Sequence, residues 1–107
     1  MKDIQGMMKQ AQVLQKKMQD TQNEINARVY IGEAGNGLVK VTMTGDGVLI
    51  KCVIDSSVLS SGEKDLVEDL IVAAHENVKS IIDNDSKETM DGALGGMNLP
   101  AGFKLPF

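Results

Sequence analysis

The spacing of apolar residues changes twice along this chain, and those changes limit the folds that it can adopt. Between residues 3 and 26, apolar side chains recur at alternating steps of three and four, with Thr21 filling one gap: Ile4, Met7, Ala11, Leu14, Met18 and Ile25. This spacing places them on one side of a helix, and it predicts a long first helix that packs along that side.

From residue 28 to residue 54 the apolar period becomes two, which is typical of strands. We predict three antiparallel strands over residues 28–32, 38–44 and 48–54, joined at Asn36-Gly37 and Asp46-Gly47, because these pairs tolerate the positive φ of short hairpin turns. Leu49 and Val53 make the third strand apolar on its second face as well. Such a strand should be covered on both faces, by a helix on one side and by a partner on the other.

A second helical pattern covers residues 60–90. Ser60 and Glu63 match a capping box at its start. Its apolar side is formed by Leu66, Leu70, Ala73, Ala74, Val78, Ile81 and Ile82. The order of elements predicts one α+β domain over residues 1–107, in which a three-stranded antiparallel meander lies between two long helices in an α-β-β-β-α, two-layer arrangement.

The chain continues into a glycine-rich segment, residues 92–107, which contains both phenylalanines and both prolines. Every odd-numbered residue from 97 to 107 is apolar, and proline is excluded from helix interiors and central strands. We interpret the segment as an extended C-terminal tail whose apolar side, including Phe103 and Phe107, lies over the sheet or over a second protomer. A disordered tail and a docking segment for another protein are the alternatives.

The net charge of −4 is unevenly distributed, with +2 on residues 1–28 and −6 on residues 60–91. The single cysteine, Cys52, excludes an internal disulfide and favours a reducing compartment. Because no apolar run approaches the ~18 residues of a membrane span, we expect a soluble cytoplasmic protein. A chain with no Trp and seven Met should have a thin aliphatic core, which favours oligomerisation.

The sequence offers little for catalysis or metal binding. His75 is the only histidine, and Cys52 lies on the apolar face of a strand, where we expect a buried, inert thiol. One His and one Cys do not provide a nucleophile with its base and orienting group. The acidic residues of the second helix are not spaced like a calcium loop. We expect no enzymatic activity, no metal site, no cofactor and no small-molecule substrate.

The first helix carries a polar face that could contact nucleic acid. Lys9, Gln12 and Lys16 share this face, and Lys17 lies beside it. Lysine neutralises phosphate, and glutamine can bond phosphate oxygens or base edges. From composition alone, however, the solvated face of an ordinary amphipathic helix is the simpler interpretation.

Four segments together resemble the YbaB/EbfC family of bacterial nucleoid-associated proteins: MMKQAQVLQKKMQ, GEAGNGLVKVTMTGDG, EKDLVEDLIVAAHENV and GGMNLPAGFKLPF. The resemblance covers essentially the whole chain and implies a homodimer that binds duplex DNA, is joined through its sheet region and projects helices as a pair of arms. It implies a cytoplasmic, nucleoid location and a contribution to nucleoid organisation and, in some members, to gene regulation.

Carried onto this chain, the resemblance places DNA contact at Lys9, Gln12, Lys16 and Lys17, and secondarily at Lys79 and Lys87 in the acidic second helix. Residues expected at the dimer interface or in packing are Val39, Val41, Met43, Leu49, Val53, Phe103 and Phe107. The alternative function is a protein-protein interaction module or adaptor without direct DNA binding, because the apolar seam, the methionines and the tail also offer protein-binding surface.

Overall fold

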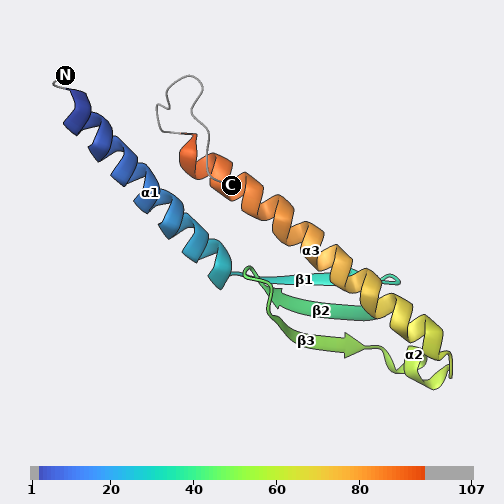
Figure 1. The fold of residues 1–107 in the computed structure, drawn as a ribbon. Helices are drawn as coiled ribbons and strands as arrows, with labels where there is room; N and C mark the ends of the chain where they lie inside the picture. Colours follow the sequence, from blue (N-terminus) through green and yellow to red (C-terminus); the bar gives the residue numbers. More distant parts are fainter. Residues whose placement is uncertain (1–2, 96–107) are drawn as a thin grey trace.

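The computed structural model describes residues 3–95, which form a sheet of three strands and two long helices that extend from it (Figure 1). In chain order the elements are α1 (Asp3–Ala27), β1 (Val29–Ala34), β2 (Val39–Thr44), β3 (Leu49–Ile54), α2 (Ser56–Ser60) and α3 (Lys64–Leu94). The predicted α+β order is confirmed. The interpretation of the C-terminal tail, with Phe103 and Phe107, lies outside the described residues.

The three strands form an antiparallel meander in the order β1-β2-β3. Tyr30 of β1 lies opposite Met43 of β2, and Val41 of β2 lies opposite Cys52 of β3. The first hairpin turn places Asn36 at φ 55° and Gly37 at φ 90°, so the Asn-Gly pair provides the left-handed backbone that this turn requires. The prediction is therefore confirmed for this turn, whereas in the second turn Gly47 has a positive φ, of 90°, and Asp46 does not.

The main core lies between α3 and one face of the sheet. Its buried residues are Tyr30, Val39, Val41, Met43, Ala74, Val78 and Ile82. The helix approaches β1 so closely that a Cβ added to Gly32 would lie 2.5 Å from the backbone nitrogen of Val78. A glycine in the middle of β1 thus allows the backbones of a strand and a helix to come into direct contact.

The buried residues of α3 follow one another at steps of four: Ala74, Val78, Ile82 and then, after the half-buried Ser86, Met90 and Leu94. Because four residues exceed one helical turn, each step moves the buried ridge about 40° around the helix axis. The ridge therefore faces the sheet near Val78 and faces α1 near Leu94. There a second core forms from Leu14, Ile25, Met90 and Leu94, with Met18 packed against it.

The second long helix begins later than the sequence predicted, and the prediction of a capping box formed by Ser60 and Glu63 is wrong. Ser60 ends the short helix α2, where its hydroxyl donates to the carbonyl of Ser56, and Glu63 precedes α3 without forming a side-chain cap. Gly62, at φ 76°, separates the two helices. Asp55 is the residue that caps a helix here, because its carboxylate accepts a hydrogen bond from the backbone N–H of Ser57.

The expected cover of the third strand by a helix is also wrong for most of that strand within residues 3–95. The contacts of α3 with the sheet are mainly to β1 and β2, and β3 lies beyond them (Figure 1), with only Ile54 packed against the core. Cys52 is consequently exposed, rather than buried as predicted. On α3, Leu66, Ala73 and Ile81 are exposed although the sequence placed them on the buried side. The buried ridge, whose residues follow one another at steps of four, does not include these three residues.

Candidate nucleic-acid interface

The first helix, α1, forms an arm that runs away from the sheet beside the second half of α3 (Figure 1). Its polar residues Lys9, Gln12 and Lys16 are all exposed. Steps of three and four place these three residues on one side of the helix, opposite the seam that packs on α3. Lys17 is also exposed and lies about 100° further round the axis. The structure therefore brings the predicted residues of α1 together on an accessible surface.

The three lysines of α1 and the arginine that follows it, Arg28, differ in whether they form ion pairs. Lys16 Nζ lies 3.2 Å from Asp20 Oδ2, and the Lys16 side chain remains 79% exposed. An exposed pair of this kind contributes little and is easily exchanged for another anion. Lys9 and Lys17 form no ion pair with another described residue. Among the cations of the arm, these two lysines are the most available to a phosphate backbone.

Arg28, by contrast, is held at the base of the arm. Its Nη1 donates to Asp85 Oδ2 at 2.8 Å and to Thr89 Oγ1 at 2.8 Å, and its Nη2 donates to Glu24 Oε1 at 3.0 Å. Tyr30 donates its hydroxyl hydrogen to the same oxygen of Asp85. Arg28 thus ties α1 and the start of β1 to α3. We therefore assign it a structural role rather than a role in contacting DNA.

The protonation equilibria of this anchor reflect these contacts. The hydrogen bonds from Tyr30 and Arg28 lower the pKa of the Asp85 carboxyl. The bonds to Asp85 and Glu24 raise the pKa of the Arg28 guanidinium. Desolvation and the Asp85 carboxylate raise the pKa of the Tyr30 hydroxyl. All three shifts favour the charged ion pair with a neutral tyrosine beside it.

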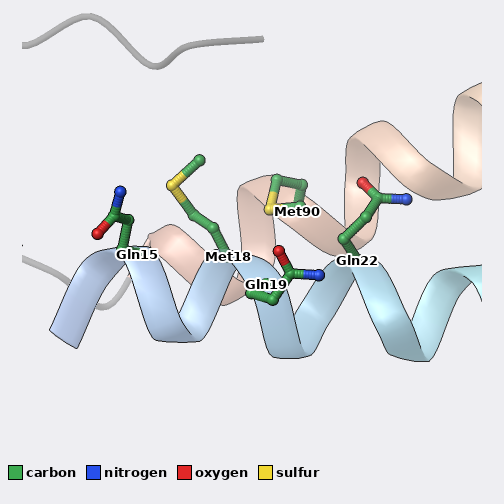
Figure 2. Close-up of a pocket in the computed structure, with 5 residues that line it drawn as sticks. All are labelled: Gln15, Met18, Gln19, Gln22 and Met90. Atoms are coloured by element: carbon green, nitrogen blue, oxygen red, sulfur yellow. The ribbon is translucent and has the colours of Figure 1, made fainter. Parts of the chain in front are cut away.

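Two shallow hollows lie along α1, and neither is a dedicated anion pocket. One, of about 330 Å³, is bordered by Lys16 and Lys17 but also by Asp20 and Glu24. The other, of about 230 Å³, lies between α1 and Met90 of α3 and is bordered on α1 by Gln15, Met18, Gln19 and Gln22 (Figure 2). Any phosphate contact should therefore occur on the outer surface of the arm rather than in a cavity.

Some of the glutamine side chains on the surface of the arm also stabilise its helix. The amide of Gln19 donates to Asn23 at 3.0 Å, and that of Gln22 donates to Asn26 at 2.8 Å. Both pairs are four residues apart, a spacing that supports a helix. Polar amides thus continue along the arm toward the sheet without adding negative charge.

The lysines of α3 lie in an acidic environment. Lys79 and Lys87 are exposed, but Glu76 and Asp83 lie one helical turn from Lys79, and Asp83 and Asp91 lie one turn from Lys87. A phosphate approaching either lysine would meet carboxylates on both sides. The structure places these two lysines on a different element from the basic face of α1.

The residues expected at the dimer interface or in packing fall into two groups. Val39, Val41 and Met43 are buried in the core beneath α3, whereas Leu49 and Val53 of β3 are each 47% exposed. Residues 3–95 contain no cluster of three His, Cys, Asp or Glu side chains that could hold a metal ion. In the same part of the chain, no helix is both long and apolar enough to cross a membrane.

Sequence reasoning missed the anchor around Arg28 and only included that residue in the charge of +2 on residues 1–28. The spacing of four between Glu24 and Arg28 was a visible signal for one of its partners. The contact with Asp85, which is 57 residues away, has no such signal.

Comparison with solved structures first defines the fold. The crystal structure of an uncharacterized protein from Helicobacter pylori superposes with a TM-score of 0.72 at 19% sequence identity and covers 87% of this chain and 98% of that one. The arrangement of helices and strands is therefore an established fold.

Sequence comparison then gives the family. The family model for the YbaB/EbfC DNA-binding family matches residues 1–97, and the chain belongs to this family. Nucleoid-associated proteins of Rickettsia akari and Rickettsia bellii are each 49% identical to it over 100 residues, which is 94% of this chain and 94% of each relative.

Proposed function

We propose that this protein is a nucleoid-associated protein that binds duplex DNA as a homodimer through the outer face of α1, with little sequence specificity. One observation carries this proposal: an arm bearing Lys9, Gln12, Lys16 and Lys17 stands clear of the sheet with these side chains exposed. We further infer a location in the cytoplasm at the nucleoid, and a contribution to nucleoid organisation and gene regulation.

The uncovered third strand supports the homodimer. β3 pairs only with β2 among the described strands, and only its last residue, Ile54, packs against the core beneath α3. It exposes Leu49 and Val53, and β1, at the other edge of the sheet, exposes Val29 and Ile31 on its open face. An apolar edge strand of this kind invites pairing with another chain. A second copy that packs on β3 would cover it and would place two α1 arms on one particle.

The arm chemistry supports binding without strong sequence preference. Lysine side chains are long and contact phosphates as point charges, which position a protein on DNA without reading its sequence. If Lys9 and Lys17 of each protomer neutralise one phosphate each, about four contacts give a slope of about −3.6 for the logarithm of affinity against the logarithm of salt concentration. Participation of Lys16 would steepen the slope.

Charge reversal tests this assignment with a matched control. Changing Lys9, Lys16 and Lys17 to Glu should abolish the shift of duplex DNA in a mobility assay. Changing Lys64, Lys79 and Lys87 of α3 to Glu gives a protein with the same net charge as the α1 variant. This control should reduce DNA binding much less. Light scattering should return the same dimer mass for the parent and both variants.

Two results would contradict the proposal. Equal losses in both triple variants would show that net charge, rather than the α1 face, governs binding. Absence of any shift of naked duplex DNA by the parent protein, with proteins still recovered by pull-down after nuclease treatment, would favour the protein-protein interaction module.

A further inference from the structure

The apolar seam of α1 continues beyond the point where α3 ends. Leu94, the last residue of α3, is buried in the cluster that contains Leu14. Toward the N-terminus the same side of α1 continues through Ala11, Met7 and Ile4, where Met7 is 65% exposed and Ile4 is 54% exposed. This uncovered seam, from Ile4 to Ala11, extends about 15 Å beyond Leu14 at the helical rise.

The described part of α3 ends at Leu94, beside the point where this uncovered seam begins. α3 ends at the same end of the molecule as the start of α1 (Figure 1), and residues 97–107 follow Leu94 after two glycines. Their odd-numbered positions are all apolar, and Pro100 and Pro106 exclude a continued helix. Eleven residues in extended form reach about 36 Å. The segment is therefore long enough to follow the seam to Ile4.

We propose that residues 97–107 dock along the uncovered seam of α1 in the same chain. The segment would continue the cover that α3 provides as far as Leu94, with its alternating apolar side chains against Ala11, Met7 and Ile4. This interpretation differs from the expectation that the tail lies over the sheet. Leu94 is sixteen residues past Val78, so the tail would have to return about 24 Å along α3 before it met the sheet.

Docking on the seam would leave the proposed DNA-binding face open. Lys9 and Lys16 lie on the opposite side of α1 from Met7 and Ala11. The even-numbered side of the tail would face solvent, and its Lys104 would add one positive charge to the arm. The proposal does not depend on DNA binding, because it concerns only the contact between the tail and α1.

Tryptophan fluorescence provides a direct test, since the chain contains no tryptophan. Phe103→Trp in the full chain gives a single reporter, and we expect its emission to be shielded from acrylamide. Adding Met7→Asp should remove this shielding, so that quenching rises to that of a free peptide of residues 96–107 that carries the same Phe103→Trp change. Ile31→Asp is the matched control, because Ile31 on the open face of the sheet is 62% exposed, and it should leave the shielding intact.

The outcomes decide among the possible positions of the tail. Loss of shielding in the Ile31→Asp protein but not in the Met7→Asp protein would place the tail on the sheet and overturn the proposal. A parent reporter as exposed as the free peptide would overturn it as well. Circular dichroism of each variant checks that α1 remains helical.

Cross-linking identifies which copy supplies the tail. In a Cys52→Ser background, Ala11→Cys and Ala101→Cys provide the only two thiols. A short bismaleimide should join them within one chain and leave the mass of a single chain on a denaturing gel. A covalent dimer would show that the tail crosses to a second copy, and it would refute docking within the chain.

Discussion

Gly32 gives the sharpest test of how α3 packs on the sheet. A Cβ at this position would lie 2.5 Å from the nitrogen of Val78, 2.6 Å from its Cβ and 2.7 Å from its Cα. Two of these atoms belong to the backbone of α3, and the third is fixed to it. No change of rotamer can relieve the overlap, so Gly32→Ala must displace the helix from β1.

The size of the effect follows from two opposing contributions. Overpacking a close-packed core costs roughly 1–3 kcal/mol, and contact with a helix backbone favours the upper end. Removing a glycine from a strand returns roughly 0.5–1 kcal/mol by restricting the unfolded chain. We therefore expect a net loss of about 2 kcal/mol in the free energy of unfolding. For a domain of this size, that lowers the melting temperature by about 8–16 °C.

Thermal and urea denaturation, followed by circular dichroism at one protein concentration, measure this loss. Gly92→Ala is the control: Gly92 also lies in an element that packs on the core, but an added Cβ there meets no atom within 4 Å. It should raise stability by up to about 1 kcal/mol through helix propensity. A Gly32→Ala protein as stable as the parent would refute the close approach of α3 to β1.

Two further predictions concern the anchor at Arg28 and the open edge of the sheet. Because the pKa of Asp85 is lowered in the folded protein, its contribution to stability is present above the unfolded value of about 3.9 and disappears as pH falls through the folded value. Asp85→Asn should therefore lower the melting temperature at pH 7, with a difference from the parent that shrinks toward pH 3; a constant difference would refute the ion-pair explanation. At β3, Leu49→Lys with Val53→Lys should give a folded single subunit by light scattering and weaker DNA retention. A dimer mass that persists at micromolar concentration would exclude β3 as the interface.

The elements themselves could be predicted from local patterns. The alternation at Val39, Val41 and Met43 defined a strand face that is buried as a unit, and Asn36-Gly37 defined its turn. The seam of α1 was recognisable as well, although only Leu14, Thr21 and Ile25 of it are buried. The sequence pattern shows which side of a helix is apolar, but not how far its partner extends.

What the sequence could not supply was the path of α3 across the sheet. That path depends on Gly32, an unremarkable glycine in a strand pattern, because the absence of its side chain admits Val78. It also depends on a ridge with steps of four, which cannot be distinguished in advance from a mixed ridge that includes Ala73 and Ile81. The exposure of β3 and of Cys52 follows from this crossing and was missed for the same reason.

The winding ridge of α3 has a consequence for how this fold can vary in length. Ile82 contacts the sheet core and Met90 contacts α1, so the residues between them set the rotation of one packing surface relative to the other. A single inserted residue would turn Met90 and Leu94 by about 100° and shift them by about 1.5 Å. The arm would then lose its support while the sheet remained intact. Insertions and deletions should thus be excluded between Ile82 and Met90.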